Sequence, residues 1–319
     1  YGGSRFYNSG AVGYTASEWK ASVVRAPIPV VPSNGTPVYN QGDKALIRNA
    51  IDAAVANDIY VIVDWHVEGD NSLTTESKAF FEEFAKAYGK VPNVIWEIWN
   101  EPVFDNAATK TRNVPSRVGT TGCDLSSTDP VNSGWNDIKA YSSEIIPIIR
   151  KYSENLILVG TPCWSRRADI AAKYPLDTTA NPDYRNLAYV VHFYSCSHKD
   201  TLRDLTSASA DQVPLFFTEW GTSFDYGGGG VCAAEADLWL AMAKQKGISW
   251  TNWSLASQGE SSSALKGSAA ANGGWKDADL TESGLYVSGQ IAKVGEAFPP
   301  TPVRLDTISL PGKYEAERY

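Results

Sequence analysis

The stretches IYVIVDW (59–65), TESKAFFEEFAKAY (75–88) and NVIWEIW (93–99) follow one another closely and decide the fold class. The first and third are short apolar runs typical of strands that are buried on both faces. The middle stretch places four apolar side chains on one helical face: Ala79, Phe80, Phe84 and Ala87. A strand, a helix and a strand in this order predict a βαβ unit with parallel strands and a right-handed crossover.

The same alternation continues on both sides of this unit. Further apolar runs typical of buried strands cover 22–28, 155–160, 187–194, 214–220 and 248–254. Helical spacing is found in 43–56, 134–151, 200–210, 231–246 and 285–296. Repeated βα units predict an α/β fold of the (β/α)8 TIM-barrel type. Because only seven strands are counted, we expect the first strand to be missing from the N-terminus of this chain.

The barrel pattern predicts one domain over residues 1–298. Two long loops, 103–133 and 256–280, follow predicted strands, so both should lie on the C-terminal face of the barrel, where active sites are built. From residue 299 the sequence no longer follows the barrel pattern and begins with a Pro-rich segment. We therefore expect 299–319 to be a linker and the start of a truncated further module.

The composition excludes several classes of function. The 319 residues carry a formal net charge of −8 without a basic stripe, which argues against nucleic acid as a partner. No apolar run approaches the ~20 residues that span a bilayer, so we expect no membrane partner. The chain has 11 Trp and 16 Tyr but one Met, which suits a saccharide-binding protein, although many of these rings should simply be core.

The four cysteines show no C-x-x-C spacing, which argues against a zinc ribbon or a redox motif. An even number fits disulfides in a protein that is secreted or periplasmic, and four buried free thiols remain the alternative. Loops that follow neighbouring strands lie side by side. We therefore predict the pairs Cys123–Cys163 and Cys196–Cys232 among the three pairings possible.

Polar side chains at the ends of the predicted strands are the candidates for chemistry, because a buried charge is costly unless it is paired or used. They are Arg25, Asp64, His66, Glu97, Asn100, Glu101, His192, Tyr194 and Glu219. Glu101 and Glu219 stand on different strands, and a closed barrel would bring them together.

Two such carboxyl groups are what glycoside hydrolysis needs, one to protonate the leaving oxygen and one to attack the anomeric carbon. The alternative is a pair of structural acids held by Arg25. Glu97 should lie deeper than Glu101 and act as a buried partner of Arg25.

Five motifs follow one another along the chain: VIVDWH (61–66), IWNEP (98–102), HFY (192–194), FTEWG (217–221) and NWSL (252–255). Together they resemble glycoside hydrolase family 5, and most closely its bacterial endo-β-1,4-glucanase branch, over about residues 3–290. The resemblance implies a retaining cellulase that uses no cofactor or metal, acts on β-glucan and is a monomer.

The resemblance also implies roles for individual residues. Glu101 would be the acid/base, Glu219 the nucleophile, and Asn100 would hold a sugar hydroxyl. Arg25 and Tyr194 would hydrogen-bond the nucleophile. Further residues would line the cleft: His66, His192, Trp253 and Glu260, with Trp164 either a second sugar platform or a core residue.

The chain departs from the family pattern at several points. The first strand, which in the family carries a His and a Trp, would precede Tyr1. Pro29 and Gln258 stand where relatives often have Tyr and Lys. These departures leave open a mannanase or xyloglucanase specificity, and a catalytically inactive glycan-binding barrel is the rival reading.

Two smaller patterns remain in the sequence. His66, Glu68 and Asp70 alternate, but spacing by two residues is a poor metal-ligand pattern, so rim positions are favoured for the two acids. The segment LPGKYEAERY (310–319) resembles the opening of a family 6 carbohydrate-binding module, with an ordinary tail as the alternative.

Overall fold

The computed structural model describes residues 3–33, 36–38, 41–69, 73–103, 128 and 134–297. Seven parallel strands form one curved sheet in the order β1-β4-β6-β8-β9-β10-β11. Their bounds are β1 Val23–Pro29, β4 Tyr60–His66, β6 Val94–Glu97, β8 Ile157–Val159, β9 Leu187–Tyr194, β10 Leu215–Gly221 and β11 Ser249–Asn252. The predicted parallel barrel is therefore confirmed.

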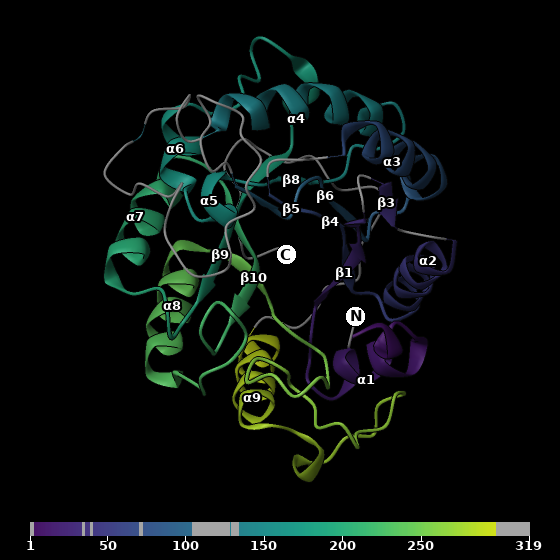
Figure 1. Ribbon diagram of the computed structural model, residues 1–319, viewed down its shortest axis with the longest axis vertical. Coiled ribbons are helices and arrows are strands. Elements are labelled where there is room, and N and C mark those ends of the chain that lie inside the picture. Colours follow the sequence, from purple (N-terminus) through teal and green to yellow (C-terminus); the bar gives the residue numbers. More distant parts are fainter. Residues whose placement is uncertain are drawn as a thin grey trace.

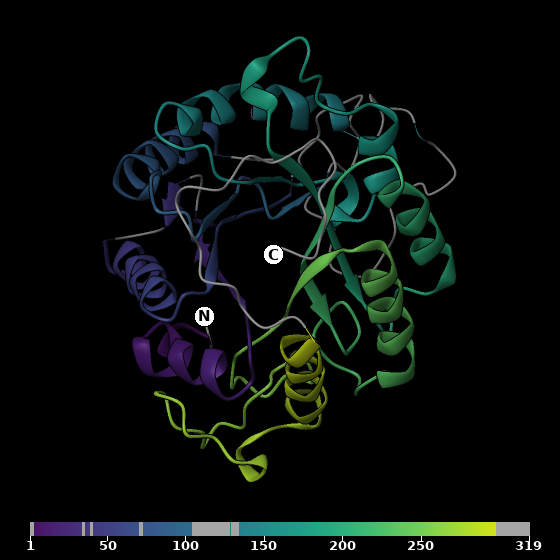
Figure 2. The ribbon, with the colours of Figure 1, turned by 180° about the vertical axis from the view of Figure 1, so that it is seen from behind.

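Helices form an outer ring around the strands, as Figure 1 shows from one end and Figure 2 from behind. Their bounds are α1 Ser9–Ser17, α2 Gln41–Ala56, α3 Thr74–Tyr88, α4 Trp135–Arg150, α5 Pro162–Ser165, α6 Ala168–Lys173, α7 Asp200–Ala210, α8 Ala233–Lys246 and α9 Glu282–Ala297. Short 3-10 turns cover Ser4–Phe6, Pro182–Tyr184 and Asp277–Asp279. Within the described residues, no helix combines the length and the apolar character that crossing a membrane requires.

Two small ladders accompany the main sheet. Strands β2 (Val31–Ser33) and β3 (Thr36–Val38) form an antiparallel hairpin after β1. Strands β5 (Glu68–Gly69) and β7 (Glu101–Pro102) pair in parallel and place Glu68 directly opposite Glu101. The second ladder thus extends the barrel wall beyond the C-terminal ends of β4 and β6, where the candidate catalytic residue Glu101 stands.

Strand alternation sorts side chains between the two faces of the barrel wall. In β4 the odd-numbered Val61 and Val63 belong to the large core under the helices, whereas Ile62 belongs to a smaller apolar cluster on the other face. Asp64 shares the strand parity of Ile62, so it lies above that cluster inside the barrel. The apolar cluster therefore supports a buried polar layer.

Strand β10 breaks the regular alternation with a β-bulge. Phe216 is opposite Val190 in β9, yet Glu219 is opposite His192. Three residue steps along β10 therefore match two along β9. The same shift separates β10 from β11. An extra residue re-aims the side chains that follow it. Thr218 and Glu219, although adjacent in sequence, can then both reach groups of the polar layer.

The two ends of the sheet, β1 and β11, face each other, and the first strand position of a (β/α)8 barrel is not filled by any described residue. The described chain begins instead with the 3-10 turn and α1, where no helix is predicted. Asn8 caps α1 by accepting a hydrogen bond from the Ala11 amide at 2.9 Å.

A satellite cluster of aromatic side chains closes this side of the molecule. Trp275 packs against Phe6, Tyr14 and Trp19, with ring centroids 5.0–5.9 Å apart. A cavity of about 1300 Å³ remains between β1, β11 and the helices α1, α2, α8 and α9. The open side of the barrel is thus covered from outside by the two ends of the described chain.

Candidate active site

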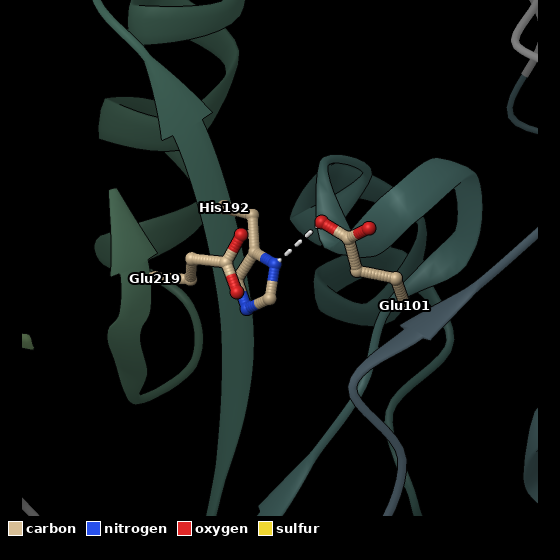
Figure 3. A group of neighbouring side chains, drawn as sticks. All are labelled: Glu101, His192 and Glu219. Atoms are coloured by element: carbon tan, nitrogen blue, oxygen red, sulfur yellow. Dashed lines mark hydrogen bonds and ion pairs between the residues drawn. The ribbon is translucent and has the colours of Figure 1, made fainter. Parts of the chain in front are cut away.

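Glu101 and Glu219 come together across the top of the barrel, with His192 between them (Figure 3). One carboxylate oxygen from each glutamate and one nitrogen of His192 all lie within 4.8 Å of one another. Glu101 stands in β7, and His192 and Glu219 stand opposite each other in β9 and β10. The carboxyl groups are close enough to act on one bond.

Glu219 is held as a carboxylate by two hydrogen-bond donors. The Arg25 guanidinium donates to its Oε2 at 2.9 Å, and the Tyr194 hydroxyl donates to its Oε1 at 2.7 Å. Burial opposes ionisation, but the positive charges of His192, Arg25 and His66 and the Tyr194 hydrogen bond together lower the pKa of Glu219. This glutamate is therefore charged at neutral pH.

Glu101 has the opposite balance. Burial raises the pKa of the Glu101 carboxyl, and although the hydrogen bond to His192 lowers it, the negative charge of Glu219 adds to the rise. His192 Nδ1 lies 2.8 Å from Glu101 Oε1 (Figure 3). Two glutamates of the same layer are thus driven toward different protonation states.

The proton positions on His192 follow from its neighbours. The Thr218 hydroxyl donates its only proton to Glu97 Oε1 at 2.7 Å, so at 2.8 Å from His192 Nε2 it can only accept. His192 Nε2 therefore carries a proton. Burial lowers the pKa of His192, but the negative charge of Glu219 and hydrogen bonding to Glu101 and Glu97 outweigh this and raise it to about 9.

The doubly protonated imidazole of His192 also determines which oxygen of Glu101 can carry a proton. The Nδ1–H of His192 donates to Oε1 of Glu101. Oε2 is then the oxygen on which Glu101 can carry its own proton. Thr218, which is not predicted from the sequence, fixes this arrangement because it accepts the Nε2 proton of His192.

Arg25 lies at the centre of the buried polar layer beneath Glu101 and Glu219. It forms ion pairs with Asp64 at 3.0 Å, Glu97 at 2.7 Å and Glu219 at 2.9 Å, and the Arg25 side chain is 5% exposed. The predicted pairing of Arg25 with Glu97 is present. Although burial opposes the charge, the pKa of Glu97 falls to about 2 beside Arg25 and His192. Removing Arg25 would leave buried charges unpaired.

Asn100 is oriented by the same arginine. Arg25 donates to the Asn100 Oδ1 at 2.6 Å, which fixes which way the amide faces. Within the described part of the chain, the buried Nδ2 of Asn100 has no hydrogen-bond partner. A buried donor without a partner is costly, so a ligand hydroxyl is a fitting acceptor for it.

His66 and Trp253 form a parallel stack with ring centroids 5.4 Å apart and planes 2° apart. His66 Nδ1 lies 2.7 Å from Asp64 Oδ2, which holds the imidazole in place. Trp253 is only partly buried. This pair presents a supported aromatic surface beside the polar layer.

A turn with three successive left-handed residues follows β8. Cys163, Trp164 and Ser165 have φ values of 66°, 55° and 54°, which is costly for residues other than glycine. The Ser165 hydroxyl donates to the Asn100 carbonyl at 2.7 Å and so ties the turn to the IWNEP motif. Trp164 is partly buried, so it is not a fully enclosed core residue.

Arg166 and His198 extend this turn and were not predicted. The Arg166 guanidinium lies 4.8 Å from the Trp164 ring centroid, and Arg166 Nη1 lies 2.9 Å from His198 Nε2. Burial and the charges of Arg166 and Lys199 lower the pKa of His198 well below its usual value. Both residues lie on loops, where strand parity gives no signal.

The disulfide Cys196–Cys232 is confirmed and joins the loops after β9 and β10. The other predicted pair involves Cys123, which lies outside the described residues, so that pairing stays a prediction. The predicted linker and tail over 299–319 also lie outside the described residues. Glu260 is partly buried and lies beside Ser262, with 3.3 Å between its Oε2 and the Ser262 hydroxyl.

The spacing of Glu101, His192 and Glu219 could in principle hold a metal ion. Both nitrogens of His192, however, already lie at hydrogen-bond distance from Glu101 and Thr218, so a metal would have to displace one of these contacts. The weaker pattern of His66, Glu68 and Asp70 cannot be completed here, because Asp70 lies outside the described residues. The arrangement favours proton transfer.

Comparison with known proteins agrees with the motifs. The family model described as cellulase (glycosyl hydrolase family 5) matches residues 2–259. An endoglucanase of Clostridium saccharobutylicum is 38% identical over 293 residues, which cover 90% of this chain and 58% of that protein. Endoglucanase Z of Dickeya dadantii is 34% identical over 309 residues, covering 94% of this chain and 62% of its own length. The chain thus spans about three fifths of these relatives.

Solved structures show the same similarity in three dimensions. A GH5 cellulase from an Icelandic hot spring isolate has a TM-score of 0.74 and 31% identity, with 94% of this chain and 87% of that chain covered. The catalytic domain of a Thermobifida fusca endoglucanase has a TM-score of 0.70 and 27% identity, with 90% and 87% covered. On motif, family model and relatives alike, this chain belongs to the cellulase family of glycosyl hydrolases, family 5.

Proposed function

We propose that the chain is a retaining endo-β-1,4-glucanase in which Glu219 is the nucleophile and Glu101 the acid/base. The observation that carries this proposal is the opposite pKa shift of two carboxyl groups whose oxygens lie within 4.8 Å. Retaining glycosidases hold their carboxyl groups about 5–5.5 Å apart, whereas inverting ones leave about 6.5–9.5 Å for a water molecule.

The reaction would proceed in two displacements. The Glu219 carboxylate attacks the anomeric carbon and forms a glycosyl ester, while the bond to the leaving oxygen breaks and Glu101 gives that oxygen its proton. Glu101, now a carboxylate, takes a proton from water, and the water oxygen displaces Glu219. Both glutamates return to their starting states, and the sugar keeps its β-configuration.

The surrounding residues support these steps. Arg25 and Tyr194 would keep Glu219 ionised, and the Asn100 Nδ2 would donate to the hydroxyl beside the reacting carbon. The cation of His192 would stabilise Glu101 as it loses its proton. Trp253 would stack under a glucosyl ring, with Glu260 and Trp164 as further sugar contacts.

The substrate is proposed to be cellulose or a related β-1,4-glucan. The named relatives are endoglucanases, and a variant of the Thermobifida fusca enzyme was solved in complex with cellotetraose. Mannanase or xyloglucanase specificity would use the same two glutamates and differ only in the cleft contacts. The disulfide supports a secreted or periplasmic location. We infer in addition that the protein acts as a monomer.

The decisive experiment measures reducing ends released from carboxymethyl cellulose, mannan and xyloglucan, and follows the anomer of the product by proton NMR. We expect rapid release from carboxymethyl cellulose only, with β-anomer formed first. Glu219→Gln in the same preparation is the control for contaminating activity. Initial formation of the α-anomer would contradict the retaining mechanism, and preferred hydrolysis of mannan would contradict the substrate.

A further inference from the structure

The loop after β10 carries an exposed aromatic pair. Phe224 is 36% and Tyr226 53% exposed, and their rings stack with centroids 5.6 Å apart and planes 11° apart. Within the described part of the chain, the other exposed large apolar side chains are aliphatic: Val55, Leu238, Leu285 and Val294. This loop thus leaves two aromatic faces at the surface while the core encloses many others.

The loop backbone is shaped around the two rings. A Cβ at Gly229 would lie 2.4 Å from Phe224 Cδ2 and 2.7 Å from the Tyr226 hydroxyl, and Gly229 has a φ of 82°. A Cβ at Gly228 would lie 2.8 Å from Tyr226 Cε2. A side chain at either position would have to displace the rings, and the positive φ of Gly229 favours glycine there as well. The pair is therefore seated by its own loop.

Neighbouring loops of the same barrel face hold this loop on both sides. Cys232 joins it to the loop after β9 by the disulfide with Cys196, and Asp225 exchanges hydrogen bonds with Ser197 at 3.0 and 3.1 Å. On the other side the Ser262 amide donates to the Gly227 carbonyl at 3.1 Å. Ordering this loop in advance lowers the entropic cost of binding at its surface.

We propose that Phe224 and Tyr226 form a stacking platform for a glucosyl unit of the polysaccharide, outside the subsites that the two catalytic glutamates define. This rests on the proposed function. Tyr226 follows Glu219 by seven residues, so the two lie at most about 25 Å apart along the chain, within reach of one oligosaccharide.

Polar groups beside the platform suit a sugar rather than another apolar surface. The Asp225 side chain is 45% exposed, and the Glu260 carboxylate lies close to Gly227 on the other side. Carboxylate oxygens accept hydrogen bonds from hydroxyls, while the flat rings take the apolar face of the glucosyl unit. An exposed aromatic flanked by acceptors is the arrangement expected of a saccharide subsite.

The test compares cello-oligosaccharides of increasing length. The double variant Phe224→Ala/Tyr226→Ala should raise KM for cellohexaose about tenfold, equivalent to ~1.4 kcal/mol. The ratio of KM for cellohexaose to KM for a short aryl β-cellobioside should rise with it. Tyr226→Phe keeps the ring and should behave like wild type. Leu238→Ala, which truncates an exposed side chain on α8, is the matched surface control.

A second variant separates ring loss from ring displacement. Gly229→Ala keeps both aromatics but pushes them from their seat, so it should raise the same KM ratio. Equal effects on long and short substrates, or no effect of the double variant on any length, would overturn the platform. Neither result touches the proposed function, which depends on wild-type hydrolysis of β-glucan.

Discussion

Glu219 and Glu101 share His192 as a neighbour, but the other groups around them differ. Glu219 faces the guanidinium of Arg25 and the hydroxyl of Tyr194, and its pKa is lowered. Glu101 faces another carboxyl group and a single imidazole, and its pKa is raised. Neighbouring side chains therefore drive the two residues toward different protonation states, since both are glutamates.

The largest loss of activity is expected when the charged glutamate, Glu219, is replaced. Glu219→Gln keeps the shape of the side chain but has no carboxylate to attack carbon, so kcat on carboxymethyl cellulose should fall by at least about 10⁴-fold. Trapping with a fluorinated glycosyl donor followed by mass spectrometry should label wild type at Glu219. A label on another residue would refute the assignment.

Removing the protonated member should have a smaller and substrate-dependent effect. Glu101→Ala should lose about 10²–10⁴-fold on cellulose, because leaving-group protonation is lost. An aryl glycoside with an activated leaving group needs no such proton, so azide should restore turnover and give a β-glycosyl azide. An α-glycosyl azide, or rescue of the Glu219 variant instead, would reverse the two roles.

The pH dependence of stability tests two groups beside the glutamates, His192 and Glu97. The pKa of His192 is raised from 6.5 to about 9, so its contribution is fully present below about pH 6.5 and is lost as pH rises to about 9. The pKa of Glu97 is lowered from 4.5 to about 2, so its contribution is lost as pH falls through that range.

The free energy of unfolding from urea titration should therefore fall by about 3 kcal/mol between pH 6.5 and 9 through His192 alone. The variant His192→Gln should show a flatter alkaline slope, whatever its stability at pH 6. An alkaline slope equal to that of wild type would mean that His192 does not hold its proton in the folded protein.

The finest test addresses Thr218, which acts on Glu101 only through His192. Thr218→Val removes the acceptor of the Nε2 proton, so the pKa of His192 should fall by about one unit, while Thr218→Ser should keep it. The chain has three histidines, so nitrogen NMR can follow each ring separately. An unchanged His192 titration in the valine variant would show that Thr218 does not fix the ring.

Much of this site could be predicted from strand ends. Glu101, Glu219, Arg25 and His192 are polar residues in or just after apolar runs, and their positions alone indicate one shared face. Thr218 could not be predicted this way, because parity counting assumes regular alternation and β10 contains a bulge. Its neighbour Glu219 was found from its motif and its charge.

The rest of the fold shows the same limit. The strands lie within a few residues of their predicted ranges because buried apolar runs are long and distinct. Helix α1 is not predicted because SGAVGYTAS has no apolar stripe, and the cap at Asn8 becomes visible only in the structure. Arg166 and His198 stand on loops, where neither periodicity nor parity applies. Only the three-dimensional structure shows that Arg166 lies beside Trp164 and contacts His198.

The bridge between Cys196 and Cys232 encloses a chain segment that includes Glu219 and the exposed ring of Tyr226. A protease that cuts after an exposed tyrosine would open this segment without releasing either piece. The two halves would stay covalently joined and migrate together until a reductant is added. A single cut after Tyr226 would thus leave Glu219 on a fragment that the disulfide still joins to the rest of the chain, so the bridge protects this exposed loop against fragmentation.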